Sequence, residues 1–216
     1  MIRLALQPEE SAGLTVLCLG AHSDDIEIGC GGTILRLAEQ YPGVMFHWVV
    51  FNAVGIRETE ARKAASLFAG TALRQILLKT FPDGFMPFEG AKVKTVFEEL
   101  KQAISPDLIL TPYRKDAHQD HRTIAELTWN TFRNHLIWEY EIPKYDGDLG
   151  QPNLFVPLDA EMGRAKVRHL MDAFKSQYSK RWFEESTFLS LLRLRGMECN
   201  ASSGYAEAFY CRKLIV

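Results

Sequence analysis

The sequence predicts an α/β fold: a Rossmann-like, doubly wound and mostly parallel sheet with helices on both faces. Three observations predict it. Strand-like apolar runs alternate with helix-like stretches, which is the pattern of repeated strand and helix units. The runs are nearly continuous rather than strictly alternating, as in parallel strands covered on both faces. Crossovers between parallel strands are right-handed, and this winds such units into a Rossmann-like sheet.

The first half of the chain contains four strand-like runs that are separated by helix-like stretches. Strands are expected at residues 14–20, 44–52, 76–79 and 108–111. Helices are expected near residues 33–40, 58–68 and 92–104.

The second half of the chain is less regular. A helix is expected at residues 123–133, a strand at 136–142 and a turn-rich loop at 144–152. Asp159 is suited to cap a helix that continues to about Ser176. A further helix is expected near residues 183–196, and a closing strand at 208–216.

Length and composition favour a single domain. The chain has 216 residues, of which 47% are hydrophobic, so it can bury a full core. No internal repeat or low-complexity linker divides it. We therefore expect residues 1–216 to form one domain.

The charge balance excludes a broad nucleic-acid-binding surface. The chain carries 25 Lys and Arg residues against 27 Asp and Glu residues, which gives a formal net charge of −2. There is no global basic field of the kind that binds nucleic acid or acidic membranes. Any recognition of an anion must therefore be local.

Cysteine usage and hydropathy indicate a cytoplasmic location. The four cysteines show no close pairing, and Cys18 lies inside an apolar run, where a reduced thiol behaves as a small hydrophobic group. Residues 1–7 are too short and too broken by Arg3 to be a signal sequence. No apolar run approaches the length that crosses a bilayer, so no transmembrane segment is expected. A homo-oligomer is compatible with the sequence, which leaves the oligomeric state open.

Two clusters of metal-compatible side chains follow the first and fourth expected strands. Residues 21–32 contain His22, Asp24 and Asp25, and residues 118–121 contain two histidines around an aspartate. With the common strand order 3-2-1-4, the first and fourth strands are neighbours and the topological switch point lies between them. The two clusters are therefore expected to meet in one crevice.

The first cluster is suited to zinc. His22 and Asp25 are three residues apart, so both side chains can face one ion, and His121 would complete three protein ligands with an open position for water. An open position is typical of a catalytic site. Asp24 is the candidate general base, because it can reach a water whose pKa the zinc has lowered. A solvated loop with a helix cap is the alternative interpretation.

The glycines that follow predict a tight turn. Gly29, Gly31 and Gly32 would permit a turn into a helix from Thr33, whose N-terminus favours anions. Their spacing is not the dinucleotide-binding fingerprint.

In the second cluster, His118 and His121 are three residues apart, with Asp120 between them. One histidine can bind the metal while the other polarises a carbonyl or donates a proton, and the carboxylate can fix a tautomer or raise a histidine pKa. A polar loop that opens the next helix is the alternative interpretation.

Both clusters resemble signatures of the LmbE-like or PIG-L family of zinc-dependent N-acetylglucosaminyl deacetylases. Residues 21–32 are similar to its AHPDDE-type signature, and residues 118–121 to its HxDH signature. Residues 57–70 resemble its Arg-Glu-rich helix, residues 82–84 its Asp-Gly turn and residues 206–209 its C-terminal strand. The chain departs from the pattern at Ser23, in place of proline, and at Ile26, in place of glutamate, with Glu27 one position later. This shift puts a supporting role for Glu27 near the metal in doubt.

The resemblance implies one Zn²⁺ per chain and a role for each matching residue. His22, Asp25 and His121 would be the zinc ligands, Asp24 the general base, and His118, tuned by Asp120, the group that stabilises the oxyanion. Arg57 and Asp83 match positions that lie near the sugar in the family, so they are candidates for substrate binding. An exposed helix charge and an ordinary turn aspartate are their alternative interpretations.

The expected activity is hydrolysis of the N-acetyl group of an acetamido sugar of the GlcNAc type, or of a related small conjugate. Acetate and a free amine would be released. Two alternatives remain open. The same zinc could hydrolyse another acyl or phosphoryl bond, or the protein could bind metal and sugar without turnover.

Overall fold

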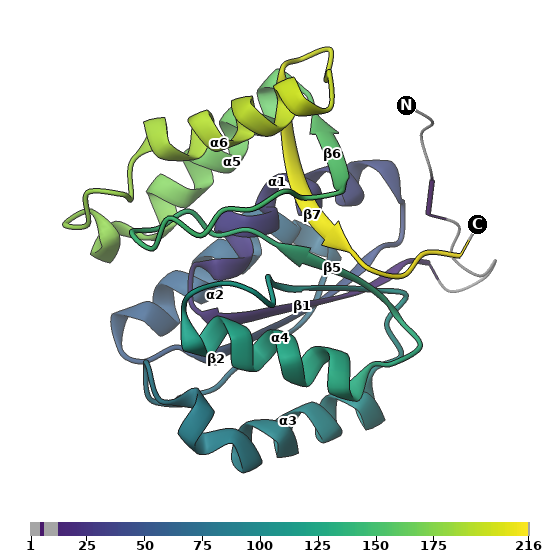
Figure 1. Cartoon of the computed structure of the whole chain (residues 1–216), viewed down its shortest axis with the longest axis vertical. Helices are drawn as coiled ribbons and strands as arrows, with labels where there is room; N and C mark the ends of the chain where they lie inside the picture. Colours follow the sequence, from purple (N-terminus) through teal and green to yellow (C-terminus); the bar gives the residue numbers. More distant parts are fainter. Residues whose placement is uncertain (1–4, 7–12, 216) are drawn as a thin grey trace.

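In the computed structural model, which describes residues 5–6 and 13–215, the strands form one sheet with the order β3-β2-β1-β4-β5-β7-β6 (Figure 1). Its strands are β1 (Thr15–His22), β2 (Met45–Asn52), β3 (Leu73–Leu78), β4 (Leu108–Pro112), β5 (Leu136–Tyr140), β6 (Leu154–Leu158) and β7 (Tyr205–Cys211). The predicted order of the first four strands is confirmed, and these four strands and β5 pair in parallel.

Helices cover both faces of this sheet, as predicted. They are α1 (Asp25–Gln40), α2 (Ile56–Ala69), α3 (Gly90–Ala103), α4 (Gln119–Thr131), α5 (Ala160–Ala173) and α6 (Glu185–Glu198), with short 3₁₀ helices η1 (Gly70–Ala72), η2 (Met86–Glu89) and η3 (Lys175–Gln177). Figure 1 shows α1, α2, α5 and α6 on one face and α3 and α4 on the other. A hydrophobic core lies on each face of the sheet, and alternate residues of β1 contribute to the two cores. Val16 and Cys18 pack in one core, and Leu17 and Leu19 pack in the other.

The last two strands differ from the rest of the sheet. β7 lies between β5 and β6 and is antiparallel to both. It begins at Tyr205, before the expected position, and Val216 lies outside the described residues. β6 was not predicted, because it is a short edge strand that contains Pro157, and proline is compatible with a strand only at such an edge.

Helix α1 begins at Asp25, which corrects the expected start at Thr33. The glycines lie inside the helix instead of forming a turn before it. At Gly29 and Gly31, aromatic rings of neighbouring elements occupy the space that a side chain would need. A Cβ atom on Gly29 would lie 2.0 Å from Cδ2 of Tyr140, and one on Gly31 would lie 2.5 Å from Cε1 of Phe68. The glycines therefore permit close packing of α1 rather than a loop.

A kink at Cys30 (φ −142°) interrupts α1. Buried charged side chains form hydrogen bonds with the backbone groups around this kink. The Glu207 carboxylate accepts hydrogen bonds from the backbone N–H groups of Gly32 (2.8 Å) and Thr33 (2.6 Å). Lys166 donates to Glu207 Oε1 and to the Ile28 carbonyl, both at 2.6 Å. The anion expected at Thr33 is thus a side chain of the protein itself.

Other boundaries agree more closely. Asp159 caps α5 as predicted, since its side chain accepts a hydrogen bond from Met162 N at 2.7 Å. The helix ends at Ala173, before the expected end at Ser176.

The prediction that residues 1–7 are not a signal sequence concerns a segment that lies mostly outside the described residues. Within the described ranges, we find no helix with the length and apolar character needed to cross a membrane.

Candidate metal and active site

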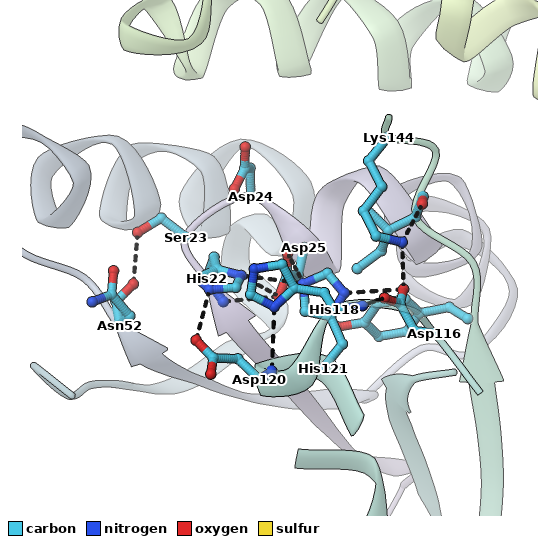
Figure 2. Close-up of polar contacts among 12 residues, drawn as sticks. His22, Ser23, Asp24, Asp25, Asn52, Asp116, His118, Asp120, His121 and Lys144 are labelled. Carbon is cyan, nitrogen blue, oxygen red and sulfur yellow. Dashed lines mark hydrogen bonds and ion pairs between the residues drawn. The ribbon is translucent and has the colours of Figure 1, made fainter. Parts of the chain in front are cut away.

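The two predicted clusters meet at the carboxyl ends of β1 and β4, which are neighbours in the sheet. The ring centroids of His22 and His118 are 4.8 Å apart, and those of His22 and His121 are 5.1 Å apart. Figure 2 shows these rings together with Asp25 and Asp120. The position is the topological switch point that the strand order predicts.

The three expected ligands form a compact triangle of donor atoms. His22 Nδ1 lies 3.1 Å from His121 Nε2 and 3.6 Å from Asp25 Oδ2, and His121 Nε2 lies 3.3 Å from Asp25 Oδ1. In a tetrahedral zinc site with bonds of about 2.0–2.1 Å, ligand atoms are about 3.3 Å apart. The spacing and the N₂O donor set therefore fit Zn²⁺. The donors of His22, His118 and His121 also lie within 4.8 Å of one another, which makes His118 an alternative third ligand.

Local backbone structure places these donors. Asp25 is the first residue of α1, and its Oδ2 accepts a hydrogen bond from the backbone N–H of His22 at 2.8 Å. His121 lies in the first turn of α4, which begins at Gln119 rather than Thr123. His118 caps this helix, because its Nδ1 accepts a hydrogen bond from Asp120 N at 3.2 Å.

The electrostatics of the triangle favour charged groups. Burial alone would lower the pKa of His121, but the Asp25 and Asp116 carboxylates together outweigh burial and raise this pKa to about 9. Burial would also lower the pKa of His22, but the carboxylates of Asp25, Asp120 and Asp83 together raise it well above its usual value. Burial would raise the pKa of Asp25, yet His121 and His22 hold it well below the usual value. Without a metal, protons on the histidines balance the carboxylate.

Asp116 is a residue of the site that the sequence interpretation missed. It is 3% exposed, and its Oδ2 lies 3.0 Å from His121 Nδ1 and 2.9 Å from Lys144 Nζ. Burial would raise its pKa, but His121 and Lys144 lower it. Its position two residues before His118 was a signal, but Lys144 is distant in sequence.

The Asp120 carboxylate contacts His22 rather than His118, which changes its expected role. Its Oδ2 lies 3.3 Å from His22 Nε2 and accepts from Gly84 N at 2.7 Å, while Oδ1 accepts from Met86 N at 3.1 Å. The backbone N–H groups of Gly84 and Met86 hold the carboxylate away from His118. Asp120 therefore contacts His118 only through its backbone N–H, which donates a hydrogen bond to His118 Nδ1. The pKa of His118 is lowered by burial and by the neighbouring histidines.

Asp83 lies at the exposed side of the cluster. Its side chain is 73% exposed, and its Oδ1 lies 3.1 Å from His22 Nε2. The two ring nitrogens of His22 therefore face different carboxylates, with Asp25 on one side and Asp83 and Asp120 on the other.

Asp24 lies apart from the metal-compatible donors. It is buried, and Figure 2 shows its carboxylate directed away from the histidine rings. Arg57 Nη2 donates to Asp24 Oδ1 at 2.5 Å, and Arg57 Nη1 contacts Glu60 (3.1 Å) and Ser176 (3.3 Å). The guanidinium that was expected to bind substrate is thus engaged by side chains of the protein.

Glu27 contacts none of the expected ligands. It is completely buried, and neither of its carboxylate oxygens has a hydrogen-bond partner among the described residues. Burial raises its pKa well above the usual value. The one-position shift from the family pattern placed a supporting role for Glu27 near the metal in doubt. In this structure, no contact of Glu27 supports such a role.

The fold and site define a class, and comparison with known proteins identifies the family. The chain is an α/β protein of Rossmann-like topology with a metal-compatible cluster of histidines and aspartates at the switch point of its sheet. Residues 17–132 match the model of the PIG-L family, described as GlcNAc-PI de-N-acetylase. The chain belongs to this family.

Individual relatives agree with this assignment. The chain is 28% identical over 141 residues to the uncharacterized deacetylase YaiS of Escherichia coli K12, a match that covers 59% of this chain and 74% of YaiS. The N,N'-diacetylchitobiose deacetylase of Pyrococcus horikoshii has a TM-score of 0.73 at 22% identity, over 93% of this chain and 84% of that protein.

The same fold also occurs with another activity. GalB of Pseudomonas putida, a 4-carboxy-2-hydroxymuconate hydratase, has a TM-score of 0.70 at 16% identity, over 93% of this chain and 98% of that protein. Such distant likenesses show the fold alone. The reaction must therefore be argued from the residues of the site.

Proposed function

We propose that this protein is a zinc-dependent N-deacetylase, folded as one domain, that hydrolyses an acetamido sugar of the GlcNAc type to acetate and a free amine. The observation that carries the proposal is the triangle of His22, Asp25 and His121 donors, whose 3.1–3.6 Å spacing fits one tetrahedral zinc ion. The family supplies the reaction class, and the acetamido sugar follows from its description.

His22, Asp25 and His121 would hold the zinc. When bound, zinc supplies a Lewis acid that polarises the acetamide carbonyl and lowers the pKa of a water molecule. Asp24 then accepts the proton of the attacking water. Arg57 binds its Oδ1, so Oδ2 is the oxygen that takes the proton after the side chain turns toward the histidines.

His118 would donate a hydrogen bond to the oxyanion. Its Nδ1 accepts the backbone N–H of Asp120, so a neutral His118 carries its proton on Nε2. The lowered pKa of its imidazolium favours this neutral form. The same N–H can stabilise negative charge on the carbonyl oxygen, and the proton that Asp24 takes from the attacking water would pass to the departing amine.

Asp120 and Asp83 act on the other side of His22. Asp120 is fixed by two backbone N–H groups and orients the His22 ring through Nε2. Asp83 is exposed at the entrance and can accept hydrogen bonds from sugar hydroxyls. Arg57 supports Asp24 in this account and reaches substrate only if it releases that carboxylate.

Acetate release from a substrate panel tests this proposal. The metal-free chain is loaded with one equivalent of zinc and given N-acetylglucosamine, an N-acetylglucosaminide conjugate, an acyl ester and a phosphate ester. We expect acetate and free amine from the acetamido sugars, and no turnover after chelation. Turnover of only the phosphate ester would support the alternative hydrolase, and zinc binding without any turnover would support a binding protein.

A further inference from the structure

Lys144 lies in the loop after β5, and its ammonium group is enclosed by acceptors next to the candidate metal site. Its Nζ lies 2.9 Å from Asp116 Oδ2, 2.7 Å from Asp148 Oδ2 and 3.5 Å from the Ile142 carbonyl. Its side chain is only 9% exposed. An ammonium removed from water to this extent requires such partners, so its position is well defined.

Its partner Asp116 is held at both carboxylate oxygens. Oδ1 accepts a hydrogen bond from His118 N at 2.7 Å, while Oδ2 lies between Lys144 Nζ and His121 Nδ1, 3.0 Å from the latter. Figure 2 shows Lys144, Asp116 and His121 in this sequence. The carboxylate therefore cannot turn away from His121 without losing contacts at both oxygens.

This contact favours one tautomer of His121, although the 3.0 Å pair of Nδ1 and Asp116 Oδ2 is an ion-pair contact without hydrogen-bond geometry in this structure. A carboxylate facing Nδ1 keeps the ring proton there, which leaves Nε2 without a proton in the neutral imidazole. Nε2 is the atom that faces His22 and Asp25. Asp116 thus presents His121 in the form that a metal requires.

We propose that Lys144 is a positioning residue for the metal site: it holds Asp116 in the orientation that directs His121 Nε2 toward the zinc. The inference rests on the proposed function, which makes His121 a ligand. Without Lys144, the buried Asp116 would lose its only lysine partner among the described residues, and its carboxylate would turn toward solvent. This movement removes the acceptor that faces His121.

The same lysine ties a surface loop to the ligand. Asp148 lies in the loop between β5 and β6, and its Oδ2 accepts both from Lys144 Nζ and from Ala117 N, the latter at 2.6 Å. Residues 144–148 are thereby joined to the segment that carries His118 and His121. Movement of this loop and metal affinity are therefore coupled, and the coupling is reciprocal.

Zinc affinity, measured on the full-length chain by competition with a chromophoric chelator, tests the inference without an activity assay. We expect Lys144→Met to weaken zinc binding by about 10–100-fold, the usual effect of losing a group that supports a ligand. Lys144→Arg keeps the charge and should restore most of the affinity. Lys115→Met removes an exposed lysine from the adjacent segment and should bind zinc as the wild type does.

A second variant covers the case in which Lys144→Met fails to fold, which urea unfolding of the metal-free protein would reveal. Asp116→Asn has nearly the same shape as the wild-type residue and should weaken zinc binding by a similar factor. If a folded Lys144→Met or Asp116→Asn chain binds zinc as tightly as the wild type, this inference is wrong while the proposed function stands. A wild-type chain that binds no zinc would overturn both.

Discussion

Arg57 Nη2 and Asp24 Oδ1 lie 2.5 Å apart, so the residue expected to bind sugar is joined to the candidate base. Arg57 also contacts Glu60, which in turn accepts hydrogen bonds from the N–H and hydroxyl of Ser176 at 2.8 and 2.6 Å. Two charged residues of α2 and the segment after α5 therefore hold the carboxylate. This arrangement holds the Asp24 carboxylate apart from the donors that would bind metal, so Asp24 must turn toward the histidines to act as the base (Figure 2).

Loss of Arg57 should impair turnover and spare the metal. Arg57→Met leaves Asp24 without its cation, so we expect a lower kcat, by up to the roughly 10²–10⁴-fold that a general base contributes. Zinc affinity should stay unchanged, because Arg57 contacts none of the three expected ligands. Arg62→Met is the matched control, since Arg62 is on the same helix but pairs with the exposed Glu58. Equal kcat in both variants would contradict this role.

The stability of the metal-free protein should fall between about pH 6.5 and pH 9. The pKa of His121 is about 9 in the folded chain against 6.5 as the ordinary value, so protonated His121 stabilises the fold below pH 6.5. That contribution, on the order of 3 kcal/mol, is lost as pH rises through 9. Urea unfolding at pH 6 and pH 9 in the presence of a chelator measures it.

Zinc should change this pH dependence. Zinc requires deprotonated histidines, so its affinity should increase with pH over the same range and offset the lost stability. Unfolding of the zinc-loaded protein at the same two pH values provides the comparison. A metal-free protein that is equally stable at pH 6 and pH 9 would show that Asp25 and Asp116 do not stabilise a charged His121.

Gly29 should not tolerate a side chain. Its Cβ atom would lie 2.0 Å from the ring of Tyr140, which is buried and donates a hydrogen bond to the Leu19 carbonyl at 2.6 Å, so the ring has little room to move. We expect Gly29→Ala to lower the free energy of unfolding by about 1–3 kcal/mol. Gly90→Ala, in a helical position with open space, should be neutral or slightly stabilising. Similar urea midpoints for the two variants would refute the close packing.

The buried pair at the kink of α1 should matter more than exposed pairs. Lys166→Met removes the cation beside Glu207, and breaking a buried pair in this way costs about 3–5 kcal/mol. Lys63→Met breaks an exposed pair with Asp172 and should cost no more than about 1 kcal/mol. Calorimetric unfolding of both variants makes the comparison, and equal losses would argue against a role for the kink network.

The parallel part of the fold was predictable because its signals are local. Continuous apolar runs and right-handed crossovers fix the order of the first four strands, and that order alone brings His22 and His121 together. The edge strand β6 was missed because proline at position 157 masks the strand pattern. The start of α1 was misplaced because its glycines, which make room for aromatic rings from distant segments, also suit a turn.

The contacts that support the site were not predictable, because they join segments that are distant in the sequence. Asp116 meets Lys144, 28 residues later, and Arg57 meets Asp24, 33 residues earlier. Such pairings depend on how loops return to the sheet edge, which no local pattern encodes. Residue types that suit a metal could be identified from the sequence, whereas the groups that orient them required the structure.

The central claim is a division of labour in which His22, Asp25 and His121 bind zinc while Asp24 moves the proton. Its most direct test is Asp24→Asn, with zinc stoichiometry and acetate release measured on the same samples. We expect one equivalent of zinc, bound as tightly as in the wild type, and turnover reduced by about 10²–10⁴-fold. Hydrolysis of acetamido sugars at the wild-type rate, or loss of zinc together with activity, would contradict the claim.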